Sequence, residues 1–210
     1  MEVTFKHTKT FRYEIINGGP EAKTVLYVLH GYGQLAKHFI QKFTRVPKDI
    51  MIVAPEAMHR FYNSGTGGRV GASWMTKEMR EVDIADNIAC LDALDAKISE
   101  EYSIERKYLL GFSQGGSTAI RWKIHGKPKF DSLIVWASSF PPEEIDNAGR
   151  LMNSSNHMLI GSDDELCNQE EQKILMEEYA SYGFKISPYI GTHDINEITL
   201  TNILGKVHSI

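Results

Sequence analysis

The stretch Tyr108-Leu109-Leu110-Gly111-Phe112-Ser113-Gln114-Gly115-Gly116 joins an apolar run of strand length to a segment with helical character. Its centre has the pattern Gly-x-Ser-x-Gly. In this pattern a sharp turn between strand and helix exposes the serine hydroxyl, and small flanking residues let the backbone bend that tightly. At ordinary glycine and serine frequencies, about one chain in fifteen of this length contains the pattern by chance. Whether the pattern has a chemical role therefore depends on which other residues the chain provides.

Apolar runs of strand length recur along the chain, most of them continuous, as expected for strands that are covered on both faces. Besides Tyr108–Leu110 they are Val25–Leu29, Ile50–Val53, Leu133–Trp136, Met158–Ile160 and Ile186–Tyr189. Two further short strands are predicted near the start, at Val3–Lys9 and Phe11–Ile16. Helical patterns lie between the later runs, at Val82–Ile98, Gly115–His125, Glu170–Tyr182 and Asn196–Leu204. This alternation predicts an α/β fold with a mostly parallel twisted sheet, helices on both faces, and one domain over residues 1–210.

Composition excludes several classes of function. A net charge of -4 gives no electrostatic reason to bind nucleic acid. The longest apolar runs are too short to span a membrane, and Met1-Glu2-Val3-Thr4 does not begin a secretory signal. Two cysteines, Cys90 and Cys167, form neither a metal-ligand pair nor a disulfide framework. We expect a cytoplasmic protein with reduced thiols and no metal site.

A serine needs a base to take its proton, and the base needs a third group to orient it. On this kind of sheet the partners follow in the order serine, acid, histidine. The acid is predicted in Ser162-Asp163-Asp164-Glu165, directly after the run that ends at Ile160. Asp164 is preferred, and Asp163 stays open because one residue of error in the loop would exchange them. His193 directly follows the last strand and is the predicted base, although singly each of these residues fits an ordinary polar loop.

Acyl transfer also requires fixed N–H donors for the developing oxyanion. One donor is predicted at the backbone of Gln114, directly after the nucleophile. The other is predicted at Tyr32, in His30-Gly31-Tyr32-Gly33 after the third expected strand, where flanking glycines let the backbone approach a substrate oxygen. A plain glycine turn is the alternative interpretation of this stretch. The serine turn, the acid, the histidine and this loop occur together in the expected order, which is stronger evidence for an active site than any one of them.

With these pieces the chain resembles the α/β-hydrolase superfamily, most closely the bacterial phospholipase/carboxylesterase branch that includes acyl-protein thioesterases. The matching residues are His30-Gly31-Tyr32-Gly33, Ala54-Pro55-Glu56-Ala57, Ser73-Trp74, Gly111-Phe112-Ser113-Gln114-Gly115-Gly116, Gly161-Ser162-Asp163-Asp164 and Gly191-Thr192-His193. The resemblance implies an eight-stranded type of sheet, a serine esterase or thioesterase reaction, and no cofactor. Three features depart from the family pattern: Gln34 in place of an aspartate, Glu165-Leu166-Cys167 after the acid, and a shorter segment before His193.

The chain is too short for a large cap domain, so only 61–79 and 140–156 are spare enough to line a pocket. We expect Phe61, Trp74 and Met75 to contact substrate, although they fit equally well as a plug for the core edge. An open, partly aromatic rim favours a carboxylesterase acting on small-molecule esters with short- to medium-chain acyl or aryl groups. A thioesterase or lysophospholipase would use the same triad, and a non-catalytic binding module is a further alternative. The oligomeric state is left open, with a homodimer possible.

Overall fold

The sheet at the centre of the molecule brings the carboxyl ends of its parallel strands to one edge. The computed structural model describes residues 3–152 and 155–208. In this part of the chain a seven-stranded sheet has the order β1-β3-β2-β6-β7-β8-β9, and only β1 is antiparallel to its neighbour. The strands are β1 (Tyr13–Ile16), β2 (Thr24–Leu29), β3 (Ile50–Pro55), β6 (Arg106–Phe112), β7 (Ser132–Trp136), β8 (Ser155–Gly161) and β9 (Lys185–Tyr189).

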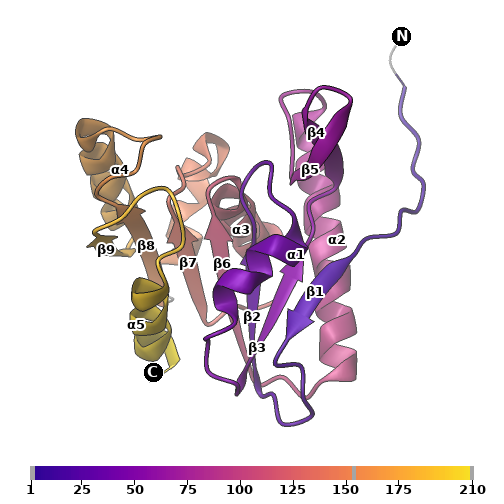
Figure 1. Cartoon of the computed structure of the whole chain (residues 1–210), viewed down its shortest axis with the longest axis horizontal. Coiled ribbons are helices and arrows are strands. Elements are labelled where there is room, and N and C mark those ends of the chain that lie inside the picture. Colours follow the sequence, from indigo (N-terminus) through magenta and orange to yellow (C-terminus); the bar gives the residue numbers. More distant parts are fainter. Residues whose placement is uncertain (1–2, 153–154, 209–210) are drawn as a thin grey trace.

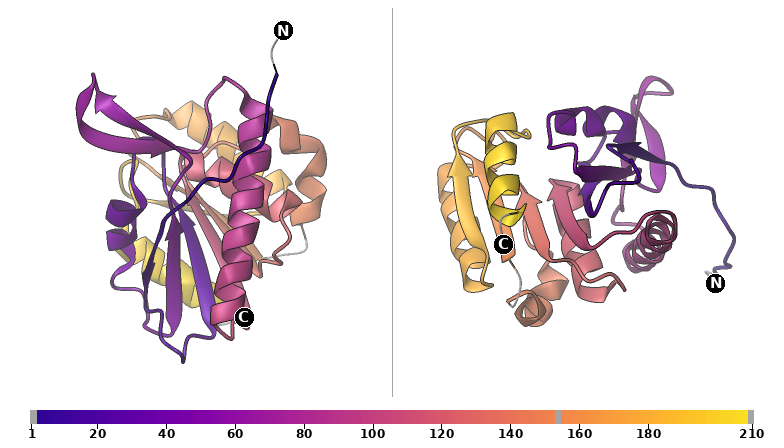
Figure 2. Two further views of the ribbon diagram at one scale, coloured as in Figure 1. Left: turned by 90° about the vertical axis from the view of Figure 1, so that its right-hand side faces the viewer. Right: turned by 90° about the horizontal axis from the view of Figure 1, so that it is seen from below.

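Helices cover both faces of this sheet (Figures 1 and 2). On β2, the side chains of Val25, Tyr27 and Leu29 join one buried cluster, and those of Leu26 and Val28 join the other. The first cluster includes residues of α2 (Arg80–Glu101), α3 (Gln114–His125) and α4 (Gln169–Ser181), and the second those of α1 (Ala36–Phe39), η1 (Ile40–Phe43) and α5 (Glu197–His208). The continuous apolar runs are therefore buried on two sides, and the predicted α/β fold with a mostly parallel sheet and helices on both faces is confirmed.

The predicted first strand, Val3–Lys9, is wrong. This segment does not pair with the sheet, and its apolar side chains Val3 and Phe5 are 74% and 90% exposed. The arm instead crosses the outer side of α2 (Figure 2), where Lys9 Nζ donates a hydrogen bond to the carbonyl oxygen of Met58 at 2.6 Å. Since an extended segment becomes a strand only where a neighbour offers a free backbone edge, the described sheet has seven strands instead of the eight that the resemblance implies.

The segment predicted as an open, partly aromatic rim, 61–79, falls largely in a hairpin of two antiparallel strands, β4 (His59–Ser64) and β5 (Gly67–Ser73). It stands above the strand ends at the top of Figure 1. The backbone of Ala72 exchanges hydrogen bonds of 2.9 Å with the loop after β2, accepting from Gly33 and donating to Gln34. The other spare segment contains the 3₁₀ helix η2 (Pro142–Leu151), with Ala148 and Leu151 buried. The described part of the chain has no large cap domain.

Candidate active site

Ser113 lies at the tight turn between β6 and α3. Its backbone has φ 52° and ψ −123°, an unfavourable conformation for a residue with a side chain. The turn is closed by two glycines. A Cβ at Gly111 would lie 2.3 Å from the carbonyl oxygen of Gly115, and one at Gly115 would lie 2.2 Å from that of Leu29. Only glycine fits at either position, so the expected strand-turn-helix geometry of the Gly-x-Ser-x-Gly pattern is present.

An acid and a base meet beside this turn. Nδ1 of His193, in the loop after β9, is 2.7 Å from Oδ2 of Asp164, in the loop after β8. The Asp164 side chain is 2% exposed, and its Oδ1 accepts a hydrogen bond from the backbone N–H of Leu166. Asp163 is exposed, and its carboxylate accepts a hydrogen bond from the neighbouring Ser162 hydroxyl. Of the two candidate acids, Asp164 is therefore the one in contact with the imidazole.

Backbone contacts hold the loop that carries His193. The N–H of Asp163 donates to the carbonyl oxygen of Gly191 at 2.9 Å, which ties the loop after β9 to the loop after β8. The N–H of His193 donates to Oε2 of Glu165. Backbone N–H groups of Glu165 and His193 lower the pKa of the Glu165 carboxyl, which stabilises its charged form. The imidazole also contacts the ring of Phe112, with 5.0 Å between centroids.

Ser113 and His193 line the same pocket together with Asp164. Within residues 3–152 and 155–208 the Ser113 hydroxyl makes no hydrogen bond. Contacts between nucleophile and base are often loose in unliganded enzymes and shorten when substrate binds. The three side chains thus converge at the carboxyl edge of the sheet, each on the loop after a different parallel strand.

The loop after β2 lies against the serine turn. A Cβ at Gly31 would lie 3.2 Å from Cβ of Ser113, so this backbone passes directly beside the nucleophile. Oε1 of Gln34, which replaces the family's aspartate, accepts a hydrogen bond from the Gly31 N–H at 2.9 Å. Neither the N–H of Tyr32 nor that of Gln114 donates to any residue that the structure describes. Both predicted oxyanion donors are therefore free to bind a substrate oxygen.

His30 supports this loop from the core as a neutral imidazole. Its side chain is fully buried, and burial lowers its pKa to about 4. Its Nδ1 lies 2.7 Å from the carbonyl oxygen of Gly31, and its Nε2 accepts a hydrogen bond from the Ala57 N–H. This pairing places the proton on Nδ1, because only a protonated nitrogen can donate to a carbonyl.

The Gln114 side chain is fixed by the end of β5. Its Oε1 accepts a hydrogen bond from the Trp74 N–H at 3.0 Å, and its Nε2 donates to the Ser73 hydroxyl and to the carbonyl oxygen of Met75. The Trp74 indole donates in turn to the carbonyl oxygen of His30 at 2.8 Å. Ser73, Trp74 and Met75 thus join the two loops that carry the candidate oxyanion donors.

Two pockets among the described residues border His193. The first, called the serine pocket, has a volume of about 390 Å³ and contains Ser113 and Asp164. Its other lining residues include Ser117, Ser138, Ser139, Leu166, Cys167 and Leu175. The second, called the arginine pocket, has a volume of about 430 Å³ and is lined by His193 with Gln34, His38, Lys42, Arg69 and Asp194.

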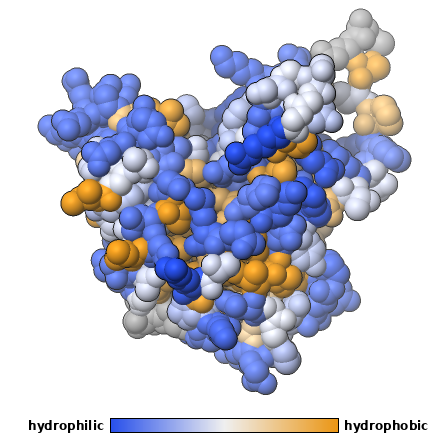
Figure 3. All heavy atoms as spheres, viewed as in Figure 1, coloured by the Kyte–Doolittle hydropathy of each residue, from blue (hydrophilic) through white to orange (hydrophobic). Residues whose placement is uncertain are grey.

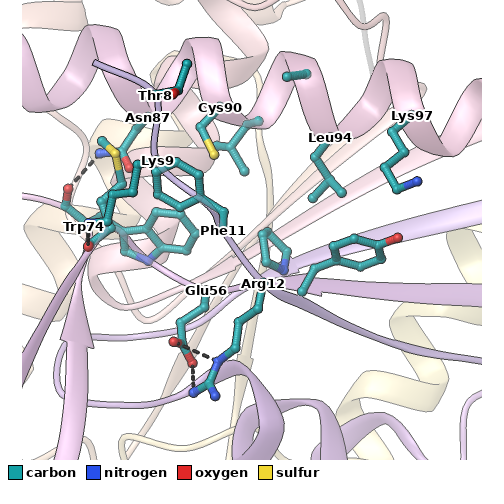
Figure 4. A pocket seen from close by; sticks show the side chains of 15 residues that line it. Thr8, Lys9, Phe11, Arg12, Glu56, Trp74, Asn87, Cys90, Leu94 and Lys97 are labelled. Carbon is teal, nitrogen blue, oxygen red and sulfur yellow. Dashed lines mark hydrogen bonds and ion pairs between the residues drawn. The ribbon is translucent and has the colours of Figure 1, made fainter. Parts of the chain in front are cut away.

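The structure does not place all of the predicted substrate contacts in these pockets. The ring of Phe61 packs on that of Tyr32, with 5.0 Å between centroids, but lines neither pocket. Trp74 is 2% exposed and lines a separate apolar cavity of about 370 Å³ between the N-terminal arm, β3 and α2, where Figure 4 shows it facing Phe11 and Cys90. Met75 lies beside Arg121, whose guanidinium is 3.6 Å from its sulfur.

Sequence reasoning missed most of the serine pocket. Ser138, Ser139, Leu166 and Cys167 follow the ends of β7 and β8, so the rule that ligands bind beyond the carboxyl ends of parallel strands could have found them. Burial raises the pKa of the Cys167 thiol, which therefore lines the pocket in its neutral form. Leu175 comes from α4, and no local pattern marks it. No three or more His, Cys, Asp or Glu side chains among the described residues form a group that could hold a metal ion.

Comparisons with known proteins identify the family of the chain. The Phospholipase/Carboxylesterase family matches residues 12–195. No curated protein sequence matches the chain. None of the helices in the described ranges is both long and apolar enough to cross a membrane.

Solved structures with similar folds include an acyl-protein thioesterase 2 from Zea mays, with a TM-score of 0.73 and 16% identity over 94% of this chain and 98% of that one. A carboxylesterase from Mesorhizobium loti has a TM-score of 0.72 and 16% identity over 93% and 94% of the two chains. The Bacillus cereus carboxylesterase has a TM-score of 0.67 and 15% identity over 95% and 94%. At these identities the structures show the shared fold, and the family match covers most of the sequence. The chain therefore belongs to the phospholipase/carboxylesterase family and is an esterase-type serine hydrolase with the α/β-hydrolase fold.

Proposed function

We propose that this protein hydrolyses short- to medium-chain acyl or aryl esters through a triad of Ser113, His193 and Asp164. The observation that carries the proposal is the 2.7 Å contact between His193 and the buried Asp164, in a pocket that also contains Ser113. A buried carboxylate on Nδ1 fixes the imidazole with Nε2 unprotonated, the form that can accept a proton from serine.

The reaction then proceeds in two steps. The Ser113 oxygen attacks the acyl carbon while His193 takes its proton, and backbone N–H groups of Tyr32 and Gln114 stabilise the oxyanion. His193 gives the proton to the departing alcohol oxygen, which leaves an acyl group on Ser113. A water molecule, deprotonated by His193, attacks the acyl carbon in the same way. The carboxylic acid leaves and Ser113 regains its proton.

The size and lining of the serine pocket support the acyl range. Its volume of about 390 Å³ lies near the lower end of the usual 300–1,000 Å³ for small-molecule sites. Three serines besides Ser113 line it, together with aliphatic side chains such as Leu166 and Leu175. This mixture suits a short chain better than a long lipid tail, which would require a continuous apolar channel.

Labelling with a fluorophosphonate probe tests the nucleophile. We expect a covalent adduct on Ser113 in the wild-type protein and none in the folded Ser113→Ala variant. Hydrolysis of acetyl, butyryl and decanoyl p-nitrophenyl esters tests the chain length, with the highest kcat/KM expected for the shorter two. The triad proposal fails if folded wild-type protein is not labelled, and the chain-length proposal fails if the decanoate is preferred.

A further inference from the structure

The arginine pocket shares His193 with the serine pocket and none of the other residues that line it. Ser113 and Gln114 line the serine pocket, while Gln34, Lys42 and Arg69 line the arginine pocket, and His193 belongs to both. A substrate whose scissile bond lies beside His193 can therefore place one half in each pocket.

Strand alternation in the hairpin directs Arg69 into this pocket. Phe61 pairs with Gly71, so Arg69, two residues from Gly71, lies on the same face of the hairpin as Phe61. That face is turned toward the loop after β2, because the ring of Phe61 contacts that of Tyr32 there. Arg60 pairs with Ala72 on the opposite face, where Nη1 lies 3.5 Å from Glu56.

The pocket carries one uncompensated positive charge. Nζ of Lys42 lies 2.6 Å from Oδ1 and 2.8 Å from Oδ2 of Asp194, so these two charges neutralise one another. The guanidinium of Arg69 makes no ion pair or hydrogen bond within the described ranges, and it is exposed to the pocket. In the space-filling view, blue hydrophilic residues and pale residues lie on the side of the hairpin, with smaller orange patches among them (Figure 3). A planar guanidinium without a partner fits a carboxylate or phosphate, which it binds through two parallel N–H donors.

We propose that the arginine pocket binds the leaving group of the substrate and that Arg69 selects alcohols carrying a carboxylate or phosphate group. This inference rests on the proposed esterase mechanism, in which His193 protonates the departing oxygen. The alcohol half must then lie on the His193 side of the scissile bond, and the acyl half stays beside Ser113 in the serine pocket. Arg69 takes no part in making or breaking bonds; it orients the alcohol half.

Matched esters test this inference. The substrates are the butyrate esters of 4-hydroxybenzoate, of 4-hydroxyphenyl phosphate, and of methyl 4-hydroxybenzoate as the neutral reference. For each protein the measured quantity is the ratio of kcat/KM for an anionic ester to kcat/KM for the neutral ester. Comparing this ratio between variants removes the intrinsic reactivity of each ester. The carboxylate and phosphate arms show which anion the pocket prefers.

We expect Arg69→Gln to lower the ratio about three- to fivefold in at least one arm, the size of one partly exposed charge pair. Arg60→Gln makes the same charge change on the other face of the hairpin and is expected to leave the ratio unchanged. Raising the salt concentration should lower the wild-type ratio, because ions screen exposed charges. An unchanged ratio in Arg69→Gln in both arms, or an equal fall in Arg60→Gln, overturns the inference.

The neutral ester and the fluorophosphonate separate this inference from the function on which it rests. Suppose that wild-type protein cleaves the neutral ester and is labelled on Ser113, but the kcat/KM ratio is the same in Arg69→Gln as in wild type. Only the anionic subsite is then wrong. If no ester is cleaved and Ser113 is not labelled, the esterase proposal fails and the subsite fails with it.

Discussion

At the scale of single residues, two adjacent aspartates with different surroundings allow a sharp test of the triad. We expect Asp164→Asn to lower kcat by about three to four orders of magnitude with little change in KM. The asparagine amide has the shape of the carboxylate, but it carries no charge to stabilise the imidazolium and does not fix the reactive tautomer. Steady-state hydrolysis of p-nitrophenyl butyrate measures the effect.

Asp163→Asn is the matched control, because it makes the same chemical change one residue away. The Asp163 side chain is exposed and bonds only the Ser162 hydroxyl among the described residues, so kcat should stay within about twofold of wild type. If the two variants lose activity equally, or if Asp163→Asn loses more, the assignment of the acid is wrong.

Gln34 shows how a residue that departs from the family pattern can still hold the loop beside Ser113. The family commonly has an aspartate here, and the structure places the Gln34 amide oxygen 2.9 Å from the Gly31 N–H. An amide oxygen accepts a hydrogen bond as a carboxylate does, although it brings no charge. The loop that carries Tyr32 is therefore held without placing a carboxylate beside the proposed oxyanion site.

At the scale of elements, the hairpin of β4 and β5 is the support of the oxyanion loop. A Cβ at Gly71 would lie 2.4 Å from the carbonyl oxygen of Gly33 and 2.4 Å from Oδ1 of Asn63. We expect Gly71→Ala to push the hairpin away from this loop, lowering the free energy of unfolding by about 1–3 kcal/mol. We also expect kcat to fall, because the Tyr32 donor moves. Urea denaturation and steady-state kinetics on one preparation measure both.

Gly67→Ala provides the comparison within the same strand. Nothing lies within 4 Å of a Cβ at Gly67, so stability and kcat should both stay close to wild type. If Gly71→Ala loses stability but keeps full kcat, the hairpin packs on the loop without positioning the oxyanion donor.

The parallel strands were predictable because their sequences carry the signal locally. Runs such as Val25–Leu29 are apolar at every position, and only a strand buried on both faces requires that. The hairpin lacks this signal, since most of its residues are exposed and the turn is marked only by the glycines around Thr66. The prediction of a strand at Val3–Lys9 is wrong for the opposite reason. This segment has strand-forming residues, but it does not pair with a strand of the sheet.

That Ser113, Asp164 and His193 lie at the same edge of the sheet was predictable, because each follows a parallel strand and parallel strands end at one edge. The walls of the serine pocket were not. Leu175 lies on α4 and Ser117 on α3, and only the packing of these helices on the sheet brings them beside the nucleophile. Trp74 shows the limit of reasoning from residue type, because a tryptophan suits a substrate pocket and a buried core position equally well.

At the scale of the whole molecule, two buried histidines link the stability of the fold to pH. His30 lies under the oxyanion loop, with its pKa lowered to about 4 by burial. His157 is a core residue of β8, and burial together with Lys185 and Lys206 lowers its pKa to about 4 as well. Both side chains are neutral in the folded protein, so protonation favours the unfolded chain.

The direction of the pH effect follows from these values. A histidine in an unfolded chain has a pKa near 6.5. Between that pH and about 4, the unfolded chain binds a proton at His30 that the folded protein does not bind. The stabilisation is therefore complete above about pH 6.5 and is lost as the pH falls. For His30 alone the loss at pH 5 is about 2 kcal/mol.

We accordingly expect urea denaturation to give a lower free energy of unfolding at pH 5 than at pH 7, at constant salt. Each of His30→Gln and His157→Leu should reduce this difference, because each removes one titrating group that is buried in the fold. His38→Gln removes an exposed imidazole and should keep the wild-type difference. Equal free energies of unfolding at the two pH values in wild type would contradict the argument from buried histidines. An equal pH dependence in all three variants would show that acid destabilises the protein through other groups. A reduced dependence in His30→Gln would mean that the residue that supports the oxyanion loop also sets the acid limit of the fold.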